Sequence, residues 1–296
     1  MPETHPLSAA PPALAPVLVH DAAGLEALAA RLAGEPAIAL DTESNSFHVY
    51  RERVCLIQIS TRSDDWLVDP LAVDPRPLGR VLAAVPDLVL HGADYDVRCL
   101  KREYGLSLPG LFDTMVAARR LGRAELGLSA LVEHHFGVRL AKAYQRSDWG
   151  KRPLAAEQMS YAALDTHFLL PLYDLLANEL RERGLAEEAR KEFQRVAAVE
   201  PRPKIFDPEG WRRMRGAQDL DPEGRAVLRA LWIAREARAS ALDRPPFKVM
   251  PEQTMMEVAR RRPHTEEEML RIAGVTPVVL RRMGDAALVA IGIHGK

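Results

Sequence analysis

The sequence predicts an α/β domain followed by a small all-helical domain. In the first part of the chain, short apolar or β-branched runs typical of a mixed sheet alternate with helical patterns. From Phe112 to Ala198 helical patterns follow one another, and they resume after a proline-containing break near residue 200. The chain has 296 residues, enough for two domains of roughly 150 residues each.

The chain begins with an alanine- and proline-rich segment, residues 1–16, which we expect to be a flexible leader. No Lys or Arg precedes an apolar run in it, so it lacks the charge order of a secretory signal. No stretch of the sequence reaches the ~18 uninterrupted apolar residues that span a bilayer, so we expect no membrane partner.

The first domain is predicted over residues 17–199. Its first helical pattern covers Ala22–Leu32. Four strands are predicted, at Ala37–Leu40, Val54–Ser60, Trp66–Val68 and Leu88–Leu90. In the helical block that closes the domain, Pro153, Pro171 and Gly184 are expected to end or kink helices.

A linker is predicted over residues 200–216, because two prolines at its start disfavour helix at the residues before them. A helical domain over residues 217–292 follows. Within it, a capping box begins at Thr265, and Thr276-Pro277 supplies the N-cap and first position of the next helix.

The composition excludes several classes of protein. The balance of 40 basic and 41 acidic residues excludes a uniformly basic, histone-like binder. Neither Cys55 nor Cys99 has a neighbour at CxxC spacing, which argues against a disulfide framework or structural zinc and favours the reducing cytoplasm. No G-x-G-x-x-G follows an early strand, so we expect no nucleotide cofactor.

Two carboxylates follow the first predicted strand. Residues i and i+2 of an extended chain share a face, so Asp41 and Glu43 are expected to point the same way. Such a pair repels unless a cation lies between its members, and oxygen ligands suit Mg²⁺ or Mn²⁺. Acidic residues after a strand are also common in turns, and this motif alone leaves that alternative open.

Further acids occur at two helical positions. Tyr161 and Asp165, at i and i+4 spacing, share one helix face about 6 Å apart, although a core tyrosine beside a surface aspartate is an equal alternative. After the strand at Leu88–Leu90 a helix begins, where Asp94 caps it or Asp96 projects from its first turn. Position alone does not choose between Asp94 and Asp96.

Together these motifs resemble the three exonuclease motifs of the DEDD superfamily, tyrosine subgroup, and most closely those of ribonuclease D. The motifs are Asp-x-Glu on a strand, an Asp after His91-Gly92-Ala93, and Tyr-x-x-x-Asp on a later helix. Phe112-Asp113-Thr114 and the stretch Arg146–Leu154 resemble further segments of the same family. Near the C-terminus, Arg244–Val249 and the helices around it resemble the HRDC domain.

This resemblance implies a ribonuclease H-like mixed sheet with flanking helices, followed by an HRDC-type helical bundle. It implies two divalent ions, Mg²⁺ or Mn²⁺, and it selects Asp96 over Asp94. The implied metal ligands are Asp41, Glu43, Asp96 and Asp165. Tyr161 would face the attacking water. The implied activity removes nucleoside 5′-monophosphates from single-stranded 3′ ends of structured RNA such as tRNA precursors.

The expected substrate-binding residues are Thr42, Trp149 and Arg152. Cations and aromatics interleave over residues 142–152 and could line a single-strand groove, unless Trp149 only anchors this loop to the core. Residue 44 is serine where many ribonuclease D sequences carry an aromatic ring, which Phe47 or Tyr50 could replace.

Clusters of arginine in the helical domain would suit phosphate contacts, or serve only structure or protein contacts. They are Arg212, Arg213 and Arg215, and Arg260, Arg261 and Arg262. Two alternatives to the RNA exonuclease are a single-strand DNA exonuclease and a non-catalytic nucleic-acid-binding scaffold.

Overall fold

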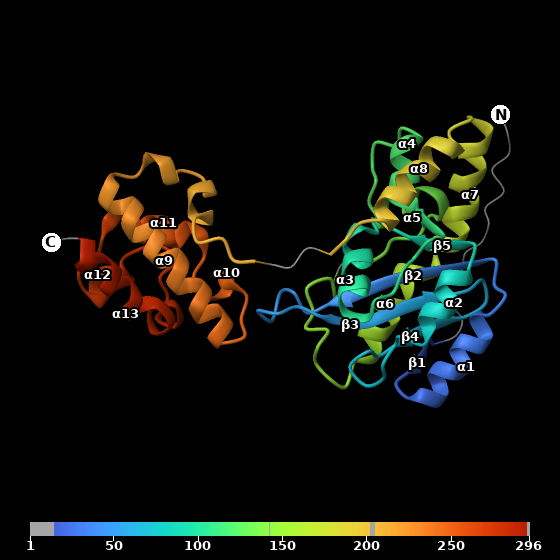
Figure 1. Cartoon of the computed structure of the whole chain (residues 1–296), viewed down its shortest axis with the longest axis horizontal. Helices are drawn as coiled ribbons and strands as arrows, with labels where there is room; N and C mark the ends of the chain where they lie inside the picture. Colours follow the sequence, from blue (N-terminus) through green and yellow to red (C-terminus); the bar gives the residue numbers. More distant parts are fainter. Residues whose placement is uncertain (1–14, 142, 202–204, 295–296) are drawn as a thin grey trace. The chain divides into compact units, whose positions relative to one another are not determined.

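The computed structural model describes residues 15–141, 143–201 and 205–294, which group into two compact units (Figure 1). The sheet unit contains residues 15–45 and 53–201. The helical unit contains residues 46–52 and 205–294, so the loop between two strands of the sheet packs with the helices. Apart from its last two residues, the expected leader, 1–16, lies outside the described residues.

Six strands form one mixed sheet. In spatial order they are β1 (Val17–Val19), β4 (Asp65–Val68), β3 (Val54–Ser60), β2 (Ala37–Ser44), β5 (Asp87–Leu90) and β6 (Leu111–Asp113). β3 runs antiparallel to both β2 and β4, and the remaining neighbours are parallel. Helices cover the sheet, which confirms the predicted fold class.

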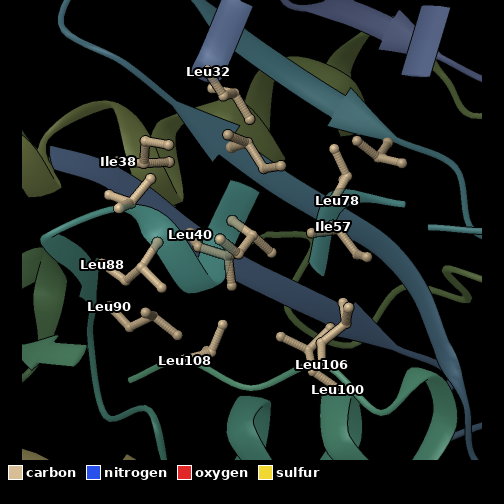
Figure 2. Packing of buried hydrophobic residues seen from close by; sticks show 14 of the residues in the cluster. Leu32, Ile38, Leu40, Ile57, Leu78, Leu88, Leu90, Leu100, Leu106 and Leu108 are labelled. Atoms are coloured by element: carbon tan, nitrogen blue, oxygen red, sulfur yellow. The ribbon is translucent and has the colours of Figure 1, made fainter. Parts of the chain in front are cut away.

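Alternation along β2 divides the sheet unit into layers. Ile38 and Leu40 belong to an apolar cluster shown in Figure 2. That cluster includes residues of α1 (Ala22–Leu32), α2 (Leu78–Ala84) and α3 (Asp94–Tyr104). Ala37 and Ala39 belong to a second cluster with α4 (Thr114–Arg120), α7 (Leu169–Glu182) and α8 (Ala186–Ala197). Because successive side chains alternate, each face of β2 addresses a different set of helices.

Two further helices complete the sheet unit, α5 (Leu128–Phe136) and α6 (Ala156–His167). Tyr161 and Ala162 of α6 pack with Cys55 and Leu56 of β3 and with Leu67 of β4. This packing fixes α6 beside the middle of the sheet.

The strand prediction was wrong in three places. It omitted β1 and β6, because three residues each are too few for an alternating pattern to show. It also ended the strand of β2 at Leu40, whereas β2 continues to Ser44. Pairing with β3 carries the strand onward, and Asp41 lies opposite Gln58 within it.

The helical unit is a bundle around a methionine-rich apolar core. Its helices are α9 (Pro222–Ala241), α10 (Pro246–Val249), α11 (Glu252–Arg261), α12 (Glu266–Leu270) and α13 (Pro277–His294), preceded by the 3-10 turns η1 (Gly210–Arg213) and η2 (Ala217–Asp219). The Thr265 hydroxyl accepts the N–H of Glu268, and the Thr276 hydroxyl accepts that of Val279, which confirms both predicted helix starts. Within the described ranges, no helix is long and apolar enough to cross a bilayer.

Candidate active site

Four of the expected catalytic side chains line one cavity of about 340 Å³ in the sheet unit. Asp41 and Glu43 reach it from β2, and Tyr161 and Asp165 reach it from one face of α6. The complete lining is Asp41, Thr42, Glu43, His91, Leu128, Gln145, Tyr161 and Asp165. The packing of α6 on the sheet thus brings together motifs that lie more than a hundred residues apart.

The fifth expected residue, Asp96, is not among the residues that line this cavity, but its charge raises the pKa values of Asp41 and Glu43. It projects from the first turn of α3, is only 6% exposed, and accepts a 2.5 Å hydrogen bond from the Thr42 hydroxyl. Asp94 is exposed and forms an ion pair with Arg98 at 2.8 Å. The structure therefore separates the two acids that position in the sequence left equivalent. Thr42, which was expected to bind substrate, instead donates this hydrogen bond to the carboxylate of Asp96.

The start of α3 is fixed by Asp113, the last residue of β6. Its carboxylate accepts the backbone N–H groups of Gly92 at 3.0 Å and Ala93 at 2.9 Å, just before α3. The same carboxylate accepts the N–H groups of Met115 and Val116 and so caps α4. The family resemblance singled out this segment without giving its role, which is to orient the helix that carries Asp96.

Burial raises the pKa values of all four acids, and neighbouring acids of the set raise those of Asp41 and Glu43 further. Burial is the main cause for Asp41, whose pKa lies well above its usual range, and the other three carboxylates add to it. Burial, then Asp165 and Asp96, raise the pKa of Glu43 to about 9. Burial also raises the pKa of Asp165 to about 7 and that of Asp96 to about 6, although the Thr42 hydrogen bond opposes the latter shift.

Such a cluster needs positive charge, and its donor atoms are all oxygen. Both properties fit hard divalent cations such as Mg²⁺ or Mn²⁺. Among the residues that the structure describes, however, no three His, Cys, Asp or Glu side chains form a ready-made metal site. The site therefore suits divalent cations by its negative charge and its oxygen donors, whereas the described carboxylates are not gathered around one ion position.

Tyr161 presents a protonated phenol to this cavity. Burial raises its pKa above the usual range, and the charges of Asp165 and Glu43 raise it further. A hydrogen bond with Gln145 opposes this shift without reversing it. Tyr161 is therefore a hydrogen-bond donor at neutral pH and not a base. Sequence reasoning missed Gln145, because it lies in a loop without periodicity.

Trp149 and Arg152, the other two residues expected to bind substrate, make their contacts with other residues of the protein. Trp149 is 1% exposed and packs 6.1 Å from the ring of Tyr161. Arg152 forms a bidentate pair with Asp69 at 2.6 and 2.7 Å. Its remaining donors bind the carbonyl oxygens of Cys55, Trp149 and Lys151. All five guanidinium N–H groups are thus used, and the loop is anchored to the core. Lys142, also expected here, lies outside the described residues.

Replacing Arg152 with methionine should lower the free energy of unfolding by about 3 kcal/mol, because buried Asp69 loses its only ion-pair partner among the described residues. Arg152→Lys should lower it less, since lysine keeps the charge but not the fork. Urea denaturation measures both, with exposed Lys151→Met as the control. An unchanged midpoint for Arg152→Met would contradict the anchoring role.

Most arginines of the two predicted phosphate-binding clusters are ion-paired within the helical unit. Arg212 pairs with Glu209 at 2.7 Å, and Arg213 pairs with Asp207 at 2.7 Å. In the second cluster, Arg260 and Arg261 share Glu257, and Arg262 pairs with Asp221. Four of these five arginines are exposed and Arg262 is half-buried, so the ion pairs of the exposed four are weak and phosphate could compete for them.

Two family models match the chain. A 3′-5′ exonuclease model matches residues 16–181, and an HRDC domain model matches residues 224–291. Ribonuclease D from Zymomonas mobilis is 33% identical over 266 residues, which cover 88% of this chain and 67% of that protein. The exosome complex exonuclease RRP6 of Saccharomyces cerevisiae is also 33% identical, but this chain spans only 38% of its length.

Solved structures give the same result. The catalytic core of RRP6 from Trypanosoma brucei superposes with a TM-score of 0.84 at 31% identity, covering 99% of this chain and 83% of that one. Escherichia coli RNase D, described as an exoribonuclease involved in structured RNA processing, has a TM-score of 0.71 at 29% identity, covering 96% and 76%. These matches confirm the resemblance to ribonuclease D and to the HRDC domain.

Proposed function

Because this chain belongs to the ribonuclease D family of 3′-5′ exonucleases with an HRDC domain, we propose that it is a divalent-metal-dependent 3′-5′ exoribonuclease. The proposed substrate is structured RNA with an unpaired 3′ end, such as a tRNA precursor, and the product is nucleoside 5′-monophosphate. Cys55 and Cys99 are buried and form no disulfide among the described residues, which supports action in the reducing cytoplasm.

One observation carries this proposal: Asp41, Glu43, Asp165 and Tyr161 share a cavity with Thr42, whose hydroxyl holds Asp96. The four acids Asp41, Glu43, Asp96 and Asp165 would hold two divalent cations, Mg²⁺ or Mn²⁺, which when bound would supply the positive charge that activates water and stabilises the leaving oxygen. In the proposed hydrolysis the water oxygen would bond to the phosphorus of the terminal phosphodiester as the bond from phosphorus to the 3′ oxygen of the preceding nucleotide breaks, and the proton that water gives up would end on that 3′ oxygen as a hydroxyl.

The protein's own groups orient this reaction. The protonated Tyr161 phenol donates a hydrogen bond that positions the attacking water, while Gln145 restrains the phenol. Asp113 fixes the start of α3, and Thr42 fixes the carboxylate of Asp96. Tyr161 and Gln145 thus orient the attacking water, and Asp113 and Thr42 orient Asp96. None of these four residues is a proposed ligand of the cations.

The test is a 3′-tailed, tRNA-like RNA labelled at its 5′ end and incubated with Mg²⁺, Mn²⁺ or a chelator. We expect stepwise shortening with either metal and none with the chelator. A matched DNA oligomer separates RNA from DNA preference. Internal cuts, activity that survives chelation, or binding without mononucleotide release would each contradict the proposal.

Replacing Thr42 with valine should lower kcat about tenfold, because the lost hydrogen bond frees the Asp96 carboxylate at a cost of about 1.4 kcal/mol in the transition state. Thr42→Ser keeps the hydroxyl and should restore most of the rate. The Mg²⁺ concentration for half-maximal activity should rise for valine only. Equal rates for valine and serine would show that the hydrogen bond does not matter.

A further inference from the structure

Gln58 of β3 is a buried amide in the interior of the sheet unit. It is 0% exposed, and neither its amide nitrogen nor its amide oxygen hydrogen-bonds to any residue that the structure describes. A primary amide carries two N–H donors and an oxygen that accepts, so several polar positions are left unused at once. Burying an unpaired polar group destabilises a fold, whereas methionine would fill the same space without this cost. Packing alone therefore does not account for Gln58.

Strand alternation places Gln58 on the face of the sheet that α6 covers. Its neighbours Ile57 and Ile59 belong to the apolar cluster of Figure 2, so Gln58 points to the opposite face. Two residues further along β3, on the same face as Gln58, the hydroxyl of Ser60 lies 2.6 Å from that of Thr166 on α6. Gln58 is therefore enclosed between the sheet and the helix that supplies part of the acidic cluster.

Asp41 is a cross-strand neighbour of Gln58. The two residues lie directly opposite each other in the antiparallel pairing of β2 with β3. Such residues project from the same face with Cβ atoms about 5 Å apart, which is within the reach of a glutamine amide. On its other side Gln58 lies opposite Leu67 of β4, whose side chain has no polar atom. Of these two neighbours, only the side chain of Asp41 can accept a hydrogen bond.

We propose that Gln58 is a positioning residue whose amide N–H holds the carboxylate of Asp41 when a divalent cation binds. This inference rests on the proposed metal-dependent function and adds a residue to it. A carboxylate that gives an oxygen to a cation keeps further lone pairs, and ligand carboxylates are themselves hydrogen-bonded. A neutral amide orients the acid without cancelling the negative charge that the cation needs. Gln58 thus serves Asp41 as the Thr42 hydroxyl serves Asp96.

The test measures binding of Mn²⁺ alone to the full chain, so that no turnover is required. The electron paramagnetic resonance signal of free Mn²⁺ reports the bound fraction during a titration. Urea unfolding in chelator reports the stability of the metal-free fold. The variant is Gln58→Met, which keeps the length of the side chain but cannot donate a hydrogen bond. The control is Gln194→Met, the same change at an exposed position of α8.

We expect Gln58→Met to weaken Mn²⁺ binding about tenfold. Its urea midpoint in chelator should be unchanged or higher, because an apolar side chain replaces an unpaired amide. At saturating Mg²⁺ the KM for RNA should stay the same, since Gln58 is fully buried and does not touch the substrate. Gln194→Met should change none of these quantities.

Two results would overturn the inference and leave the proposed function intact. One is equal Mn²⁺ affinity of the wild type and Gln58→Met. The other is a lower urea midpoint of Gln58→Met in chelator, which would show that the amide is already paired without metal and serves the fold. A wild type that binds no Mn²⁺ would overturn both the proposed function and this inference.

Discussion

Replacing Asp165 with asparagine should reduce mononucleotide release at least 1,000-fold while the chain still folds, and Asp41→Asn should do the same. The amide keeps the shape of the carboxylate but removes the negative charge that would hold a divalent cation. A loss of that size corresponds to about 4 kcal/mol of transition-state stabilisation. Single-turnover assays with saturating Mg²⁺ measure the rate directly.

The control is Asp94→Asn, the same chemical change at an exposed position on α3 that pairs with Arg98. We expect this variant to retain most of the activity. Thermal unfolding should show that Asp165→Asn is at least as stable as the wild type, because burial and neighbouring acids raise the pKa values in this cluster. Near-normal turnover by either active-site variant would refute the metal-site assignment.

The metal-free protein should lose stability as the pH rises from 6.5 to 9. An acid with a raised pKa holds its proton longer in the folded state than in the unfolded state, so folding weakens as the pH passes from the unfolded pKa to the folded pKa. Asp165, with a pKa of about 7, and Glu43, with a pKa of about 9, titrate in this window. Each titrating group changes the free energy of unfolding by at most about 1.4 kcal/mol per pH unit.

The window starts at 6.5 because His91 acts in the opposite direction below it. Burial lowers the pKa of His91 to about 4, so its contribution to stability is lost as the pH falls from 6.5 toward 4. Urea unfolding at several pH values, in chelator and in Mg²⁺, measures the effect. Glu43→Gln should flatten the chelator curve, and added Mg²⁺ should raise stability most at high pH. A chelator curve that rises with pH would contradict this account.

Local patterns in the sequence determined the shared faces of the acidic motifs. Strand alternation places Asp41 and Glu43 on the same side of β2, and helical spacing places Tyr161 and Asp165 on the same side of α6. Helix starts were equally predictable, because a cap such as Thr265 bonds within its own turn. Each of these features depends on residues within a few positions of one another.

Contacts between distant segments decided the rest. Thr42 selects Asp96 by a hydrogen bond across 54 positions, and Arg152 reaches Asp69 across 83. The sequence shows which groups can donate or accept, but only packing shows which partner each one meets. Burial makes each of these pairings necessary, because a buried polar group left without a hydrogen-bond partner destabilises the folded state by about 1–3 kcal/mol. For this reason the sequence identified the acidic motifs, whereas the tertiary structure determined which neighbours hold them.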